Sequence, residues 1–115
     1  MTRTIHNKLV RDKIVDIIEQ SGKKAYSRIL SPDEFFNELM KKLHEEVSEF
    51  QESNDVEELA DILEVVEYLA IAKGASMDEL LKIKEKKSLE RGGFNKRIFL
   101  ESVECEGSHG NKKDY

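Results

Sequence analysis

Several features that define common protein classes are scarce or absent in this chain. Only one of its 115 residues is a cysteine, Cys105, which excludes an intrachain disulfide and a cysteine-based metal knuckle. No apolar run has the length of a secretory signal peptide, or the roughly 20 residues that span a membrane. There is no basic surplus, because the net charge is -5, and this argues against a general nucleic-acid binder. We therefore expect a soluble cytoplasmic protein whose partners include neither a nucleic-acid polymer nor a membrane.

What the chain does have is a high content of charge combined with regular apolar spacing. Charged residues make up 37% of the sequence and apolar residues 38%, and the period of the apolar residues indicates a folded helical protein rather than disorder. The length fits one domain, so we expect a single domain over residues 1–105 and a disordered tail over residues 106–115. One core of this size is modest, and oligomerisation would bury more apolar surface.

Helix start and stop signals divide the chain into four predicted helices, which gives an all-α fold. A short first helix contains Leu9 and Ile14 and ends near Gly22, since glycine suits the left-handed position after a helix. The second helix starts at Ser31, whose side chain and that of Glu34 can form a reciprocal capping box. We expect it to run to about residue 53.

The third helix begins after Asn54 or Asp55 and stops at Gly74. Its apolar residues lie around much of its circumference, so it is predicted to be the central helix, packed on more than one side. A second capping box at Ser76 opens the fourth helix, which ends at the glycine pair 92–93. A short β-hairpin is expected between residues 26–30 and 98–103, where apolar residues nearly alternate.

Two pairs of acidic residues have the spacing that places side chains on one side of a helix: Glu46 with Glu49, and Glu58 with Asp61. Glu46 falls in the middle of the apolar stripe of the second helix, Glu49 lies at its edge, and Glu45 points farther out. Four carboxylates in one cleft need protons, basic side chains or a cation. An all-oxygen set suits Mg²⁺ or Mn²⁺. The alternative is that each pair is a solvated face, which is the usual role of a single pair in a chain with 24 acidic residues.

The acidic residues and their flanks resemble a known family. The run 45–49 (EEVSE) with residues 58–61 (ELAD) resembles the EExxE…ExxD signature of the MazG-like, all-α nucleoside triphosphate pyrophosphohydrolases. The flanks NKLVRDKI (7–14) and RGGFNKRI (91–98) are similar to a subgroup labelled phosphoribosyl-ATP pyrophosphohydrolase-like. The resemblance extends from residue 7 to about residue 100. The gap of eight residues between the two acidic pairs requires a tight turn between the helices.

The resemblance implies a fold, a reaction and a set of ligands. The fold is a four-helix MazG-like bundle, assembled as a homodimer or homotetramer with sites near subunit interfaces. The reaction is a Mg²⁺-dependent cleavage between the α- and β-phosphates of an NTP or dNTP, which releases the monophosphate and pyrophosphate. The implied metal ligands are Glu46, Glu49, Glu58 and Asp61. Because Glu49 lies at the edge of the stripe, with access to solvent, we assign it the catalytic role of positioning the attacking water.

Basic residues near both ends of the chain are candidate phosphate-binding groups. They are Lys8 and Arg11 on the N-terminal side and Lys87, Arg91 and Lys96 on the C-terminal side. Arg11 and Arg91 are favoured, since both lie in flanks that resemble the family. For any single one of these residues, ordinary surface charge is the alternative role.

Two other functions stay open. One is phosphoribosyl-ATP hydrolysis in histidine biosynthesis, although the enzymes of that pathway typically carry Tyr-His where this chain has Glu64-Val65. The other is a non-catalytic helical interaction protein whose acidic pairs are structural. The identity of the base and sugar is not encoded in any recognisable cluster of residues, although Tyr68 and Phe94 could stack on a base.

Overall fold

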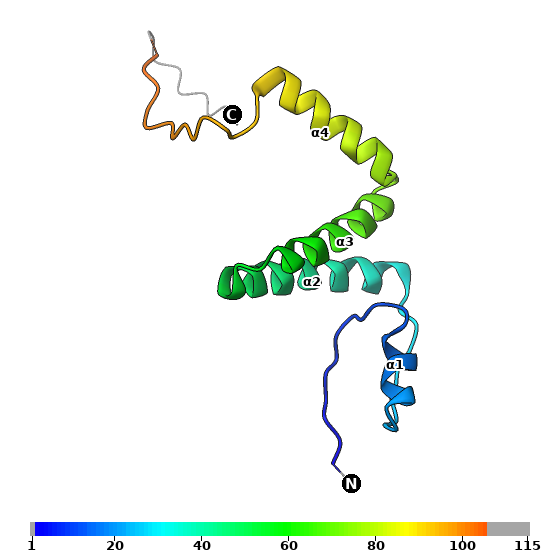
Figure 1. Cartoon of the computed structure of the whole chain (residues 1–115). Coiled ribbons are helices and arrows are strands. Elements are labelled where there is room, and N and C mark those ends of the chain that lie inside the picture. The colour runs from blue at the N-terminus through cyan, green and yellow to red at the C-terminus, as the bar shows by residue number, and fades with distance from the viewer. Residues whose placement is uncertain (1, 106–115) are drawn as a thin grey trace. The chain divides into compact units, whose positions relative to one another are not determined.

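The computed structural model describes residues 2–105, and their regular structure is entirely helical (Figure 1). The helices are α1 (Ile14–Gln20), α2 (Pro32–Ser53), α3 (Val56–Ala72) and α4 (Met77–Arg91). The prediction of an all-α chain with four helices is therefore confirmed. None of the described helices combines the length and the apolar content that crossing a membrane requires.

The chain divides into two compact units, Met1–Lys82 and Ile83–Tyr115, with the division inside α4. The first unit contains the acidic residues of interest. The expectation of one domain stays a prediction, and the predicted disordered tail lies outside the described residues.

Helix α2 starts as its sequence predicts. The Ser31 side chain accepts a hydrogen bond from the backbone N–H of Glu34 (3.3 Å), and the Ser31 N–H donates to the Glu34 carboxylate (3.2 Å). Arg28 also donates to this carboxylate at 2.9 Å. These donors favour the charged form and lower the pKa of Glu34 to about 2, with the Arg28 contact as the largest cause.

Helices α2 and α3 form an antiparallel hairpin joined by only two residues. Asn54 ends α2 in the left-handed conformation (φ 55°), and the Asp55 side chain accepts from the Glu57 N–H at 3.1 Å to cap α3. Within the first unit this is the pair of helices that packs together. Leu39 of α2 and Val65 of α3 are its two buried apolar residues, 3% and 7% exposed. The predicted tight turn is confirmed.

The apolar surface of α3 is only partly covered. Leu59, Leu63 and Ile71 are 44%, 53% and 50% exposed, so the prediction that α3 is buried on several sides is wrong for the described single chain. One helix covers one face of its neighbour, and α2 covers the face that contains Val65. The four-helix bundle stays a prediction.

The other two helices differ slightly from expectation. Leu9 precedes α1, which starts only at Ile14, and Gly22 follows it with φ 91°. At the start of α4 the Ser76 hydroxyl accepts from the Glu79 N–H (3.1 Å) and donates to the Glu79 carboxylate (3.3 Å). The cap is confirmed, but the carboxylate bonds the hydroxyl instead of the Ser76 backbone. Gly92 ends the helix with φ 84°.

The predicted β-hairpin is wrong, because no strand occurs in the described residues 2–105. Residues 26–30 and 98–103 are extended or irregular, and their apolar side chains are exposed, with Ile29 at 97% and Ile98 at 80%. A two-stranded ribbon is marginal without a buried apolar face. These side chains provide no such burial, so alternation alone did not produce a strand.

Candidate metal and phosphate site

Glu46 is the one buried charged residue among those described. It lies one turn before the end of the apolar stripe of α2, is 6% exposed, and its Oε1 is 3.5 Å from Lys42 Nζ. Its Oε2 is buried without a hydrogen-bond partner. Burial is the largest cause that raises the pKa of Glu46; the nearby Glu49 and Asp61 add to it, and Lys42 opposes it.

The two predicted acidic pairs come together around this carboxylate. Oxygens of Glu46, Glu58 and Asp61 lie within 4.8 Å of one another, and so do oxygens of Glu45, Glu46 and Glu49. Glu46 belongs to both groups. Glu58 and Asp61 come from α3 and are half-buried, whereas Glu49 is exposed. The structure thus brings the four predicted carboxylates, two from each helix, into two groups that share Glu46; their role as metal ligands stays a prediction.

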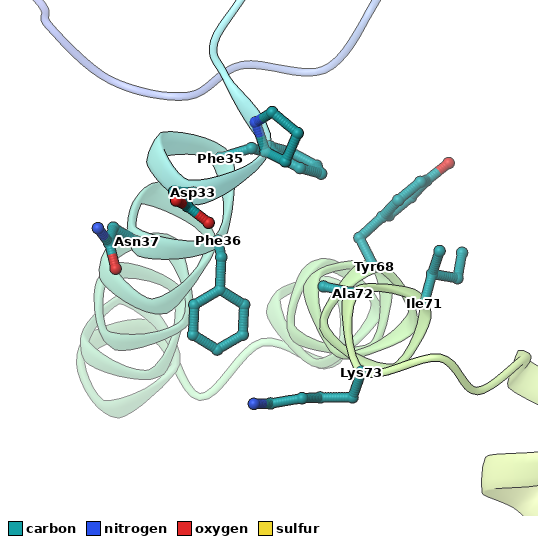
Figure 2. A pocket seen from close by; sticks show the side chains of 9 residues that line it. Asp33, Phe35, Phe36, Asn37, Tyr68, Ile71, Ala72 and Lys73 are labelled. Atoms are coloured by element: carbon teal, nitrogen blue, oxygen red, sulfur yellow. The ribbon is translucent and has the colours of Figure 1, made fainter.

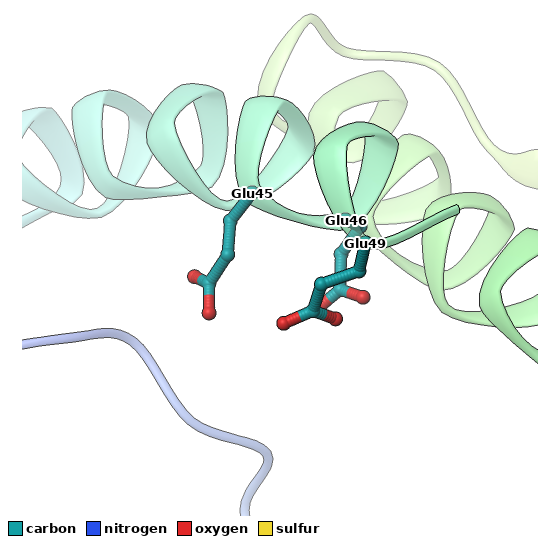
Figure 3. A group of neighbouring side chains, drawn as sticks. All are labelled: Glu45, Glu46 and Glu49. Atoms are coloured by element: carbon teal, nitrogen blue, oxygen red, sulfur yellow. The ribbon is translucent and has the colours of Figure 1, made fainter. Parts of the chain in front are cut away.

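The structure corrects the prediction for Glu45. We expected it to point away from the site, but Figure 3 shows Glu45, Glu46 and Glu49 on the same side of α2, and the oxygen of Glu45 reaches the group. The helical period predicts only the direction of the Cα–Cβ bond. A glutamate side chain has three rotatable bonds, so its carboxylate can turn toward the site. Two cations hold Glu45 at the site, Lys42 at 3.5 Å and Lys8 at 3.9 Å.

The pKa of Glu58 is raised as well. Burial is the largest cause, followed by the charges of Glu49 and Asp61. Raised pKa values on two helices facing one another indicate that the carboxylates repel, because each one disfavours the charge of its neighbours. A divalent cation would remove this repulsion, and the orphaned Oε2 of Glu46 offers a free ligand atom for it. The donor set, all carboxylate oxygen, therefore fits Mg²⁺ or Mn²⁺.

Basic side chains from the N-terminal segment reach the same place. We call residues 7–13 the strap; it precedes α1 and has no helix or strand. Arg11 donates from Nη2 to Asp61 Oδ1 at 2.8 Å, and its Nη1 is 3.4 Å from Glu64 Oε2. Lys8 contacts Glu45. Two of the predicted phosphate-binding residues are thus beside the carboxylates.

A cavity of about 250 Å³ lies between the strap and the α2–α3 hairpin. It is lined by three cationic side chains, two carboxylates and two apolar residues: Lys8, Arg11, Lys42, Glu46, Asp61, Val10 and Ile14. Lys42 and Glu64 were not among the site residues predicted from the sequence. The signal for Lys42 was its spacing, four residues before Glu46 and three before Glu45.

The remaining predicted phosphate-binding residues are Lys87, Arg91 and Lys96, which lie in the second unit. All three are exposed. Their part in the site stays a prediction.

A separate open cavity of about 700 Å³ lies where α2 begins and α3 ends (Figure 2). Phe35, Phe36 and Tyr68 line it, and the Lys73 ammonium group is 5.1 Å from the centre of the Phe36 ring. Phe36 is ten residues from Glu46, about 15 Å along the helix. This cavity is therefore distinct from the carboxylate site.

Comparison of the chain with protein-family models, with curated proteins and with solved structures finds no match. The geometry of the carboxylates and the resemblance of the motifs remain the two grounds for a function.

Proposed function

We propose that this chain is a metal-dependent nucleotide pyrophosphohydrolase, which cleaves an NTP or dNTP to the monophosphate and pyrophosphate. The observation that carries the proposal is the buried carboxylate of Glu46, which belongs to both acidic groups and has an unpartnered oxygen. Such a group destabilises the fold unless a ligand compensates it. A buried carboxylate whose pKa is raised and which lines a cavity, as Glu46 does, is typical of a functional site.

Different residues of the site would have different roles in the reaction. Glu46, Glu49, Glu58 and Asp61 would hold Mg²⁺ or Mn²⁺. When bound, the ion offsets phosphate charge and lowers the pKa of a water molecule. Glu49 is the exposed member of the set and can orient that water by accepting a hydrogen bond from it.

The cationic residues are suited to bind the phosphate chain of the substrate. Lys8, Arg11 and Lys42 line one cavity with the carboxylates of Glu46 and Asp61, so positive and negative groups lie close together. A phosphate chain that carries a divalent cation also presents groups of both signs. Guanidinium and ammonium groups bind phosphate oxygens in charge-assisted hydrogen bonds.

The test is the release of pyrophosphate from a panel of NTPs and dNTPs with Mg²⁺ or Mn²⁺. We expect activity that disappears when the metal is chelated and in Glu46→Gln. The matched control is Glu52→Gln, which removes an exposed carboxylate from the same helix and should leave activity unchanged. If Glu46→Gln keeps full activity, the assignment of the metal site is wrong. If the wild-type chain is inactive over the whole panel, the non-catalytic interaction protein becomes the better hypothesis.

We also propose that the protein acts as a homodimer or homotetramer. Leu59, Leu63 and Ile71 of α3 are each about half exposed, and burial of such a surface between copies would add to a small core. Light scattering measures the mass directly. A monomer at micromolar concentration would contradict this part of the proposal.

A further inference from the structure

Arg11 forms an ion pair with one of the carboxylates that a metal ion would need. Its guanidinium donates to Asp61 at 2.8 Å and lies 3.4 Å from Glu64. Asp61 is also one of the three residues whose oxygens gather around the buried carboxylate of Glu46. The same carboxylate is therefore required by two cations, the arginine and a divalent ion. Since like charges repel, each weakens the binding of the other.

The strap is suited to release this arginine. Residues 2–11 make no helix or strand, and Arg11 is 55% exposed in its side chain. Among the described residues, the ion pairs between the strap and the hairpin are those of Lys8 and Arg11. Because exposed ion pairs contribute little stability, breaking the Arg11 contact costs little.

A released guanidinium stays close to the site. Arg11 lines the 250 Å³ cavity together with Lys8 and Lys42, so a short movement away from Asp61 leaves it among the cationic groups of that cavity. Arginine presents parallel N–H donors that match two oxygens of a phosphate. The carboxylate pair of Asp61 and Glu64 and a phosphate group are thus alternative partners for the same donors.

We propose that Arg11 is an exchangeable counter-ion of the acidic site: it neutralises Asp61 and Glu64 when no divalent cation is bound, and it transfers to the phosphate chain when metal and nucleotide bind. This inference rests on the proposed function, because it uses the same carboxylates as metal ligands. It adds that Arg11 weakens the binding of the metal ion alone and strengthens the binding of the metal–phosphate complex. Arg11 is therefore a positioning residue with effects of opposite sign on two ligands.

The experiment measures both ligands on the full chain. Mn²⁺ binding is followed by electron paramagnetic resonance without nucleotide, and the binding of inorganic triphosphate is followed by calorimetry with Mn²⁺ present. In Arg11→Gln, Mn²⁺ alone should bind about three- to tenfold more tightly, and triphosphate about tenfold more weakly. Arg11→Lys keeps the charge and should leave Mn²⁺ affinity near wild type while weakening triphosphate. Lys23→Gln, which removes an exposed positive charge elsewhere in the first unit, should change neither.

The outcomes separate this inference from the proposed function. If Mn²⁺ binds the wild-type chain but binds Arg11→Gln equally or less tightly, the exchange is wrong and the metal site stands. If Mn²⁺ does not bind the wild-type chain at all, both fail. A second measurement needs no variant: the NMR signal of the Arg11 guanidinium in the wild-type chain should move when Mg²⁺ is added. A signal that stays in place at saturating Mg²⁺ would overturn the exchange.

Discussion

Replacement of Glu46 by glutamine should stabilise the metal-free protein while it removes the metal site. The carboxylate is 6% exposed, has one unpartnered oxygen and has a pKa above its ordinary value of 4.5, mainly because of burial. Its folded-state proton is thus held more tightly than in the unfolded chain. The free energy of unfolding must then fall as the pH rises from about 4.5 through the folded-state pKa.

The size of the effect follows from the same contacts. Each unit by which the pKa is raised costs about 1.4 kcal/mol once the group is ionised, and an unsatisfied buried polar group costs about 1 to 3 kcal/mol. Lys42 recovers part of this at 3.5 Å. We therefore expect Glu46→Gln to raise the free energy of unfolding by about 1 to 2 kcal/mol at pH 8 without metal, and by much less at pH 4, where the native carboxyl is already protonated.

Urea unfolding at several pH values, with and without Mg²⁺, measures both sides of this prediction. Magnesium at 100 times its dissociation constant should stabilise the wild-type chain by about 2.7 kcal/mol, and it should have no effect on Glu46→Gln. Glu52→Gln serves as the control, with wild-type behaviour in every condition. The reasoning is refuted if Glu46→Gln is less stable than wild type at pH 8 without metal, or if the two proteins lose stability in parallel between pH 4.5 and 8.

Three further predictions concern single contacts in the first unit. Lys42→Gln should lower the free energy of unfolding at pH 8 by about 1 to 3 kcal/mol, because it leaves the buried Glu46 without its cation; urea unfolding would contradict this if the loss persisted at pH 4. Ser31→Ala should cost about 1 kcal/mol through the lost cap of α2, and an unchanged urea midpoint would count against the cap. The Glu34 carboxyl should titrate at about pH 2 by NMR, so that its contribution to stability, complete above pH 4.5, is lost as the pH falls toward 2. In Arg28→Gln that titration should move upward, and a midpoint unchanged from wild type would show that Arg28 is not the main cause.

Local signals predicted the helices well. Ser31 and Glu34 defined the start of α2, because a cap is formed by residues within a few positions of one another. For α3 the sequence allowed Asn54 or Asp55 as the cap, and the structure shows Asp55. Position in the apolar stripe identified Glu46 as buried, since the period of a helix fixes which residues share a face.

Contacts between residues far apart in the sequence could not be predicted from local patterns. The bond from Arg11 to Asp61 joins residues 50 positions apart, and no local pattern specifies that the strap lies over the hairpin. The path of the glutamate side chain at Glu45 depends on Lys8, another distant residue. The absent hairpin failed for a related reason: apolar alternation favours a strand only where a second surface buries it.

The two-residue connection between α2 and α3 also has a consequence for the order of folding. Both acidic pairs lie within nine residues of Asn54, so closing this short hairpin brings the carboxylates together with little loss of chain entropy. Contacts of this kind form early, whereas Arg11 must close a much longer loop to reach Asp61. We therefore expect the hairpin to gather its negative charge before the arginine arrives, and divalent cations in the medium to speed its closure.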